Sequence, residues 1–312
     1  MEEQSVAVVF PGQGAQRPGM GRDFYDNIQV SRDTYHEASK ALGWDVAAMC
    51  FEEDVRLDLT EYAQPCILAT EIAMLRGLCS LYGFSPAFFG GHSLGEYTAL
   101  VAVGALPLSE ALQIVHIRGR LMQEAVPVGV GGMSAVISDN INVDTIYDIL
   151  SDLPIDVANI NSANQVVISG ESNAMPEAEK LFMAATKNQT LRFVPLNVSA
   201  PFHSRFMNTI KETFKEALRA LWKRLALSGA KRVTSNFTGG FHSDRFDEVV
   251  DRLVSQLSNP VQWRDNMYNL ASKADKIYEI GPSRPLRDFF KTIGMKCSSI
   301  TTLSSAKRIF EN

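Results

Sequence analysis

Short apolar runs alternate with longer stretches of helical periodicity along the chain. The run SVAVVF at 5–10 predicts a buried strand, which ends at the turn signal Pro11-Gly12. A second short strand is predicted at 87–90, and a helix follows it from Glu96. Further helical patterns are present at 22–41 and 64–82. This alternation of strands and helices indicates an α/β fold.

A different order of elements is predicted between about 130 and 196. Strand, helix, strand, strand, helix and strand follow one another, at 131–137, 142–152, 155–160, 165–170, 173–187 and 190–196. This βαββαβ order is typical of a ferredoxin-like unit. We therefore predict an α/β-hydrolase-like catalytic domain at 1–129 and 197–312, with a ferredoxin-like subdomain inserted at 130–196. The large domain resumes near 203 and includes a strand at 276–280.

The composition is typical of a globular protein. Hydrophobic residues make up 46% of the 312 residues and charged residues 21%, which excludes collagen, coiled coil and bulk disorder. Thirty basic and 35 acidic residues leave a net charge of -5. The protein as a whole is therefore not expected to bind nucleic acid or anionic membrane.

Cysteine usage and the N-terminal residues favour a cytoplasmic location. The four cysteines show no CxxC spacing and no disulfide framework, which favours a reducing compartment; they are Cys50, Cys66, Cys79 and Cys297. Met1-Glu2-Glu3-Gln4 is acidic where a signal peptide is basic. The weakly polar stretch at 97–108 is shorter than the roughly 20 residues that a bilayer requires, so we expect no membrane span.

Residues 91–95, GHSLG, form a G-x-S-x-G between a predicted strand and a predicted helix. This is the context of a nucleophile elbow, in which a sharp turn exposes the serine hydroxyl. The hydroxyl of Ser93 would then lie at a helix N-terminus, where developing negative charge is favoured. An ordinary glycine turn capped by a serine accounts for the same residues, so both interpretations stay open at this point.

A serine nucleophile needs a general base, and the chain contains five histidines. His203 is the best placed, because it follows the strand that closes the inserted subdomain and lies at a helix start. The other four fit other roles: we expect His36 and His242 to be exposed, and either His92 or His116 could simply be packed.

The loop PGQGAQ at 11–16 follows the first predicted strand, where α/β folds place oxyanion donors or bind phosphate. Arg17 occupies the third glycine position of a dinucleotide fingerprint, and the chain contains no G-x-x-x-x-G-K-[ST]. Nicotinamide and P-loop sites therefore lose their main support, and backbone donation to an oxyanion remains. No Cys/His spacing suggests a metal site.

Arg118 lies on an otherwise apolar predicted helix, where burial of an unpaired guanidinium is costly. It therefore needs an anionic partner. A salt bridge with Glu110 or Glu124 would satisfy it within the chain. Alternatively, its two parallel donors would grip a substrate carboxylate, which suits arginine better than lysine.

Eight motifs carry a family resemblance over essentially the whole chain. They are FPGQGAQ (10–16), TEYAQPCILATE (60–71), GHSLGEYTAL (91–100), IRGRLMQEAVP (117–127), NSANQVVISG (161–170), VSAPFH (198–203), NPVQW (259–263) and EIGP (279–282). In this order they resemble the malonyl-CoA:acyl-carrier-protein transacylases, the stand-alone acyltransferases of fatty-acid and polyketide synthesis. The resemblance implies an enzyme that moves a malonyl group from malonyl-CoA to the phosphopantetheine thiol of an acyl carrier protein. No resident cofactor is implied, because the carrier brings the phosphopantetheine.

The resemblance also implies roles for individual residues. Ser93 would be the acylated nucleophile and His203 its base, with ping-pong kinetics. The amides of Gln13 and Leu94 would form the oxyanion hole, and Arg118 would clamp the malonyl carboxylate. The backbone carbonyl of Gln262 would orient the histidine. The implied substrate-binding positions are Gln64, Met122 and Phe202. Phe202 is similar to the residue found in malonyl-selective domains. The implied machinery is a Ser-His dyad without a carboxylate.

Two other function classes use or retain similar residues. A lipase-like hydrolase would place its histidine near the C-terminus, whereas more than a hundred residues follow His203. A proofreading acyl hydrolase with the same elbow acts on uncharged acyl groups, which an apolar or neutral residue at position 118 would suit. This chain has the charged Arg118 there. A catalytically silent carrier-binding homologue would be expected to lack Ser93 or His203, and both are present.

A local excess of positive charge lies at 205–232, where eight basic residues accompany two acidic ones. Lys215, Arg219 and Lys223 recur every four residues with Lys211, opposite an apolar stripe of the same predicted helix. This basic stripe is a candidate docking site for the acidic carrier protein. A solvated helix face is the simpler explanation.

Overall fold

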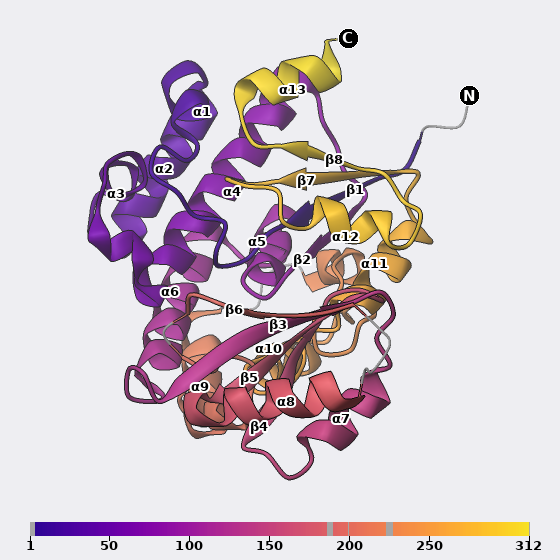
Figure 1. Ribbon diagram of the computed structural model, residues 1–312. Helices are drawn as coiled ribbons and strands as arrows, with labels where there is room; N and C mark the ends of the chain where they lie inside the picture. The colour runs from indigo at the N-terminus through magenta and orange to yellow at the C-terminus, as the bar shows by residue number, and fades with distance from the viewer. Residues whose placement is uncertain (1–3, 186–189, 199, 223–226, 312) are drawn as a thin grey trace.

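The computed structural model describes residues 4–185, 190–198, 200–222 and 227–311, and it contains two sheets that form separate layers (Figure 1). The larger sheet consists of β1 (Val6–Phe10), β2 (Phe88–Gly91), β7 (Lys276–Ile280) and β8 (Cys297–Ile300). Its order is β2-β1-β7-β8, and every neighbouring pair is parallel. The carboxyl ends of β1 and β2 therefore meet at one edge, where α/β folds place their sites.

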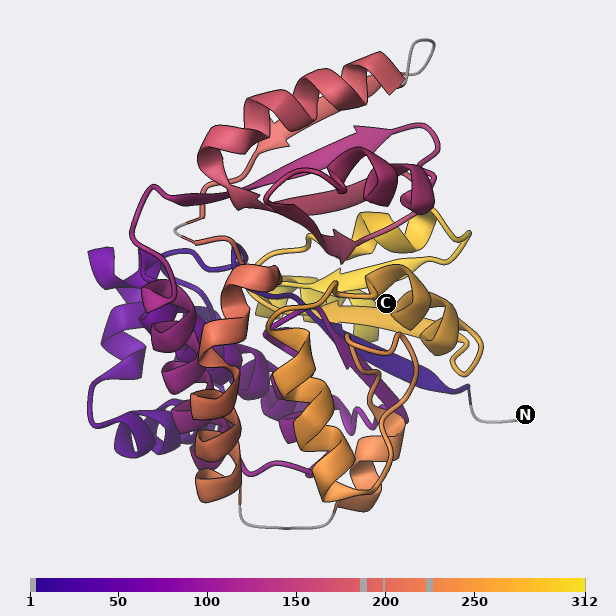
Figure 2. The ribbon, with the colours of Figure 1, turned by 90° about the horizontal axis from the view of Figure 1, so that it is seen from below.

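Helices surround the larger sheet. Those before the small sheet are α1 (Arg22–Asn27), α2 (Gln29–Leu42), α3 (Val46–Phe51), α4 (Thr60–Tyr82), α5 (Gly95–Ala102) and α6 (Leu108–Glu124). Those after it are α9 (Lys211–Leu221), α10 (Phe246–Gln256), α11 (Trp263–Ala271), α12 (Arg287–Lys291) and α13 (Leu303–Phe310). Helices α9 and α10 run side by side (Figure 2).

The small sheet is antiparallel and consists of β3 (Gly131–Ser138), β4 (Ile155–Ile160), β5 (Gln165–Glu171) and β6 (Leu191–Pro195), in the order β4-β5-β3-β6. Its two helices, α7 (Val143–Leu150) and α8 (Met175–Ala185), lie at the bottom of Figure 1, away from the larger sheet. The fold class predicted from the sequence is confirmed. The domain boundaries at 129/130 and 196/197 stay a prediction.

The other face of the small sheet looks toward the large domain. On β3, Val136 packs with the side chains of α7 and α8, whereas its neighbours Ala135 and Ile137 line a cleft. On β4 the register shifts between Val157 and Asn159. This bulge lets Asn159 line the cleft although Val157 packs toward the helices.

Backbone hydrogen bonds join the small sheet to the segment before α11. Val261 N donates to Ala158 O at 2.9 Å, and Ile160 N donates to Val261 O at 2.9 Å. The edge strand β4 is therefore held by the large domain at this point, which fixes the cleft between the two layers.

Helix α4 begins at Thr60, four residues before the predicted start, and Pro65 lies inside it. A proline lacks the N–H that would bond the carbonyl four residues earlier. That carbonyl belongs to Glu61, and it accepts a hydrogen bond from Nδ1 of His116 at 3.1 Å. The histidine on α6 therefore replaces the lost donor, which the local sequence pattern did not indicate.

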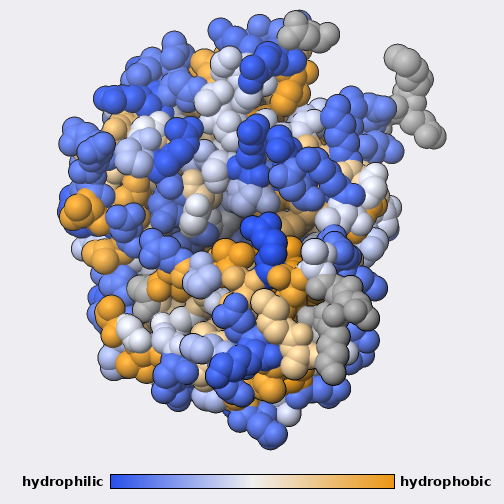
Figure 3. Space-filling model, viewed as in Figure 1, coloured by the Kyte–Doolittle hydropathy of each residue, from blue (hydrophilic) through white to orange (hydrophobic). Residues whose placement is uncertain are grey.

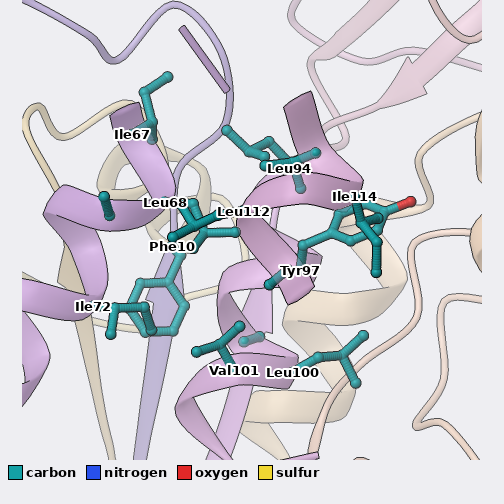
Figure 4. Close-up of a cluster of buried hydrophobic side chains, with 14 of the residues drawn as sticks. Phe10, Ile67, Leu68, Ile72, Leu94, Tyr97, Leu100, Val101, Leu112 and Ile114 are labelled. Atoms are coloured by element: carbon teal, nitrogen blue, oxygen red, sulfur yellow. The ribbon is translucent and has the colours of Figure 1, made fainter. Parts of the chain in front are cut away.

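Helix α4 is the core helix of the large domain. Its length and composition would let it cross a bilayer, but 72% of its most apolar window is buried inside the protein. Ile67, Leu68 and Ile72 pack against Phe10 of β1 and Leu94 beside α5 (Figure 4). The core therefore lies directly beneath the turn that carries Ser93.

Three further elements differ from the prediction. The helix predicted at 22–41 is two helices, because Ile28 is extended at φ -130° and ψ 117°. Strand β8 was not predicted, since CSSI is short and half serine. The helix predicted beyond 205 starts as a 3₁₀ turn at Arg205–Ile210, so α9 is shorter than the basic stripe suggested.

Candidate active site

Ser93 lies in the turn between β2 and α5 with a backbone φ of 51°. Non-glycine residues rarely adopt this conformation, and it marks a strained functional turn. A Cβ on Gly91 would overlap the backbone of Gly95, and one on Gly95 would overlap the backbone of Phe10. The glycines of the motif are therefore required by close backbone approach, which favours the elbow over an ordinary capped turn.

Asn236 holds the elbow from the opposite side. Its Oδ1 accepts a hydrogen bond from Ser93 N at 2.6 Å, and its Nδ2 donates to Gly91 O at 2.7 Å. Both groups are main-chain atoms of the turn, so Asn236 stabilises the strained conformation. The sequence showed no signal for this role, because Asn236 lies in a loop without a recognisable motif.

The ring of His203 joins Ser93 to α10. Nε2 lies 2.8 Å from Ser93 Oγ, and Nδ1 lies 2.7 Å from the backbone oxygen of Gln256. Because a carbonyl only accepts, Nδ1 carries the hydrogen and Nε2 keeps a lone pair toward the serine hydroxyl. This tautomer can take the proton of Ser93.

The prediction that Gln262 orients the histidine is wrong. Gln262 O accepts from Asn266 N at 3.0 Å, at the start of α11, while Gln262 N donates to Asn236 O. The orienting carbonyl belongs to Gln256, the last residue of α10. A helix leaves its last carbonyls without intrahelical donors, so this one is available to the ring.

Burial is the main cause that lowers the pKa of His203 from 6.5 to about 3. The charge of Arg118 lowers it further, and the hydrogen bond to Gln256 opposes the shift. The ring is therefore neutral at physiological pH and available as a base.

Arg118 lies on α6 with 1% of its surface exposed. Its Nη2 donates to Ser93 Oγ at 3.1 Å and to Gln256 Oε1 at 2.8 Å, and its Nη1 donates to Gln64 Oε1 at 2.9 Å. The guanidinium also lies 5.4 Å from the ring centroid of Tyr97.

Within the described residues, no carboxylate forms an ion pair with Arg118, so the alternative of a bridge to Glu110 or Glu124 is wrong. Burial lowers the pKa of Arg118, and its Nε has no hydrogen-bond partner in the described part of the chain. A buried cation held only by neutral groups favours an anionic ligand. The anion would bind next to Ser93 Oγ.

The predicted oxyanion donors lie on either side of the elbow. The loop after β1 packs closely against it, since a Cβ on Gly12 would come within 2.6 Å of His92 O. The N–H groups of Gln13 and Leu94 donate to no acceptor among the residues that the structure describes. Leu94 also precedes the first turn of α5. Both amides are thus available to a ligand oxygen.

A cavity of about 830 Å³ opens above Ser93, between the small sheet and the large domain. The predicted substrate-binding residues Gln64, Met122 and Phe202 line it, together with Arg118 and His203. Figure 3 shows a hollow in the middle of this face, with apolar side chains mainly below it and hydrophilic ones above it. Its volume and mixed lining suit a ligand larger than an acyl group alone.

Two of the remaining histidines contradict or refine the predictions. His242 was expected to be exposed but is buried, because Phe241 pairs with Thr234 and folds the loop inward; its Nε2 lies 2.7 Å from Glu96 Oε1. His92 Nε2 lies 2.9 Å from Asn161 Oδ1. His36 is exposed as expected.

The basic stripe of α9 is compensated by α10. Lys215 pairs with Asp251 at 2.8 Å and Arg219 with Asp247 at 2.9 Å. Lys223 lies outside the described residues. The acidic residues come from a segment about 30 positions later, so the charge count along 205–232 overstated the free positive charge of this face.

Comparisons with known proteins agree with this geometry. The acyl transferase domain family model matches residues 7–286. The malonyl CoA-acyl carrier protein transacylase of Bacillus subtilis (strain 168) is 35% identical over 300 residues, which cover 95% of this chain and 92% of that protein.

Solved structures agree as well. The malonyl-CoA:acyl carrier protein transacylase of Xanthomonas oryzae pv. oryzae has a TM-score of 0.90 at 33% identity, covering 100% of this chain and 99% of that one. A malonyl-transacylase in complex with its type II PKS acyl-carrier protein has a TM-score of 0.88 at 32% identity, with 99% of both chains covered.

Proposed function

The chain belongs to the acyl transferase family, among its malonyl-CoA:acyl-carrier-protein transacylases, and we propose that Ser93 and His203 carry its reaction. The enzyme transfers a malonyl group from malonyl-CoA to an acyl carrier protein, as fatty-acid and polyketide synthesis require.

In the first half-reaction, Ser93 Oγ attacks the thioester carbonyl while His203 Nε2 takes the hydroxyl proton. The Nε2 to Oγ distance of 2.8 Å supports direct transfer, which contributes about 10²- to 10⁴-fold to such reactions. The N–H groups of Gln13 and Leu94 stabilise the oxyanion of the tetrahedral intermediate. The carbon–sulfur bond then breaks, His203 returns the proton to the coenzyme A sulfur, and a malonyl ester remains on Ser93.

In the second half-reaction, the phosphopantetheine thiol of the carrier enters the cavity that coenzyme A has left. His203 takes the thiol proton, and the sulfur attacks the ester carbonyl. The carbon–oxygen bond to Ser93 breaks, and the serine oxygen regains the proton from His203. Both half-reactions use the same residues, because the leaving group of the first and the nucleophile of the second are both thiols on a phosphopantetheine arm.

The observation that carries this proposal is the meeting of two groups at Ser93 Oγ. His203 Nε2 lies 2.8 Å from it and Arg118 Nη2 lies 3.1 Å from it. The first suits a general base and the second suits a carboxylate of the bound acyl group. A hydrolase of uncharged acyl groups would gain nothing from a buried guanidinium at this place, which disfavours the proofreading alternative.

Gln64, Met122 and Phe202 shape the acyl end of the cavity. Gln64 Oε1 accepts from Arg118, while Gln64 Nε2 contacts Met122 Sδ at 3.9 Å. Phe202 precedes His203 and is 7% exposed, so its ring limits the space beside the reacting carbon.

We further propose a cytoplasmic location, which the free state of Cys50, Cys66, Cys79 and Cys297 supports.

Initial-rate kinetics with malonyl-CoA and a carrier protein test the proposed mechanism. A covalent malonyl-enzyme predicts parallel lines in double-reciprocal plots at several fixed carrier concentrations. Intersecting lines would indicate direct transfer in a ternary complex and would contradict it.

A further inference from the structure

Glu96 is a fully buried carboxylate in the first turn of α5, three residues after Ser93. Its Oε1 lies 2.7 Å from His242 Nε2. Its Oε2 accepts from Gln256 Nε2 at 2.6 Å and from Asn236 N at 3.1 Å. All these neighbours can donate, so the carboxylate is satisfied by hydrogen bonds, although Glu96 is not among the described residues that line the cavity.

The amide of Gln256 connects Glu96 to the site. Its Nε2 donates to Glu96 and to Ser93 O at 3.0 Å, while its Oε1 accepts from Arg118 Nη2 at 2.8 Å. An ionised carboxylate only accepts, so it forces the NH₂ end of the amide toward itself. The oxygen end must then face Arg118.

We propose that Glu96 is a positioning residue for malonyl recognition, which acts on Arg118 through the side-chain amide of Gln256. This inference rests on the proposed role of Arg118 as the clamp on the malonyl carboxylate. If the Gln256 amide were reversed, its NH₂ would face the N–H donors of Arg118. The guanidinium would then lose the hydrogen bond that holds it beside Ser93.

The neutral amide of Gln256 separates Glu96 from Arg118, so Arg118 remains able to bind a substrate carboxylate. A direct salt bridge would neutralise Arg118 and compete with the substrate carboxylate. Through Gln256, the negative charge of Glu96 stabilises the buried cation, while Gln256 accepts from Arg118 Nη2 and leaves the second hydrogen of Nη2 directed at Ser93 Oγ. Hydrogen bonds in a buried chain of this kind strengthen one another.

His242 fixes the far end of the chain. Its side chain and that of Glu96 have 0% exposure, and its Nδ1 has no hydrogen-bond partner within the described residues. Because the carboxylate only accepts, Nε2 carries the hydrogen of this contact. The ring therefore occupies Oε1 and leaves Oε2 for Gln256 and Asn236.

Glu96→Gln tests the inference because it removes the charge and little else. The new amide oxygen can still accept from Gln256 and Asn236, and its NH₂ can face His242 Nε2, which accepts in the other tautomer. As a neutral acceptor it holds the Gln256 amide less strongly, and it supplies no negative charge behind Arg118. We expect kcat/KM for malonyl-CoA to fall about tenfold or more, as for other buried charged hydrogen bonds. For acetyl-CoA, which lacks the carboxylate, we expect a change within about twofold.

Glu71→Gln is the matched control. Glu71 is also a fully buried carboxyl, but its Oε2 accepts from Thr98 on the far side of α5, and no hydrogen bond links it to Arg118 in the described part of the chain. Burial raises the pKa of the Glu71 carboxyl well above its usual range. The ratio of malonyl to acetyl kcat/KM should stay that of the wild type.

Arg118→Ala, alone and with Glu96→Gln, separates this inference from the proposed function. If Glu96 acts through Arg118, Glu96→Gln causes no further loss on malonyl-CoA once Arg118 is gone. An additive loss, or equal losses on both substrates, would reduce Glu96 to a structural role. If Arg118→Ala abolishes the malonyl preference while Glu96→Gln keeps it, this inference alone fails; if Arg118→Ala keeps the preference, the proposed clamp fails as well.

Gln256→Met gives a second route should Glu96→Gln not fold. It removes the side-chain amide but keeps the backbone oxygen that orients His203. We expect both substrates to lose rate, because the bond from Gln256 Nε2 to Ser93 O is also removed, with the larger loss on malonyl-CoA. A wild-type substrate ratio in Gln256→Met would overturn the inference.

Discussion

His203 Nδ1 lies 2.7 Å from the backbone oxygen of Gln256, so a main-chain carbonyl occupies the place that a carboxylate takes in a Ser-His-Asp triad. A carbonyl fixes the tautomer and the ring plane as well as a carboxylate does. It supplies no full negative charge, however, and therefore does little to stabilise an imidazolium. The low pKa of His203 follows from its burial and from the charge of Arg118, which the hydrogen bond to Gln256 opposes without cancelling.

The base role of His203 predicts a large kinetic defect without loss of the attachment site. In His203→Ala, the acylation rate with malonyl-CoA should fall about 10²- to 10⁴-fold, because the hydroxyl of Ser93 loses its proton acceptor. Rapid-quench measurement of the first half-reaction gives this rate. A decrease of less than about fivefold would show that another group takes the proton.

The pKa of His203 predicts how acylation depends on pH. The pKa is lowered to about 3, so the neutral base is fully present throughout the range in which an ordinary histidine titrates. A profile of kcat/KM for malonyl-CoA should therefore show no inflection near 6.5. In Arg118→Ala the acid limb should move to higher pH, because the nearby positive charge is removed.

The same pKa predicts a pH-dependent stability. The unfolded chain takes up a proton on this histidine below pH 6.5, whereas the folded chain does so near 3, so stability falls as the pH decreases through this window. Urea unfolding of wild type and His203→Gln at several pH values measures the difference. The wild type should lose stability more steeply below 6.5, and parallel curves would contradict the pKa.

The unpaired guanidinium predicts substrate discrimination. Arg118→Ala should lower kcat/KM for malonyl-CoA on the order of a hundredfold, since a buried bidentate ion pair is lost. Acetyl-CoA carries no carboxylate and should lose far less. Steady-state measurement of kcat/KM with both substrates tests this prediction. Equal losses on malonyl-CoA and acetyl-CoA would indicate that Arg118 has only a structural role.

The ion pairs of α9 predict a small effect on carrier binding. Lys215 and Arg219 already pair with Asp251 and Asp247, and all four side chains are partly or largely exposed. In the double variant Lys215→Ala and Arg219→Ala, we expect an unchanged KM for the carrier. We also expect a loss below about 1 kcal/mol of unfolding free energy for each pair. A KM that rises strongly at low ionic strength would restore the docking interpretation.

Local rules were sufficient for the elbow and for most strands. Gly91, Ser93 and Gly95 lie within one turn, so their spacing alone predicted a strand, a strained serine and a helix. The alternation of apolar residues likewise located β1 and the strands of the small sheet. These features depend on neighbours within a few positions of the chain.

The remaining features of the site depend on contacts between distant segments. Gln256 and Gln262 lie near each other in sequence, and only the end of α10 determines which carbonyl meets His203. The buried ring of His242 contacts Glu96, which is 146 positions away. The turn of Asn159 toward the cleft depends on a bulge in β4. None of these has a periodic signal in the sequence.

Intact-mass measurement tests the central claim most directly. After incubation with malonyl-CoA, the wild-type protein should gain the mass of one malonyl group, and fragmentation should place it on Ser93. Addition of a carrier protein with its phosphopantetheine arm should remove this mass from the enzyme and transfer it to the carrier. Ser93→Ala should remain unmodified under the same conditions. A malonyl adduct on Ser93→Ala, or a wild-type adduct that the carrier does not remove, would contradict the account.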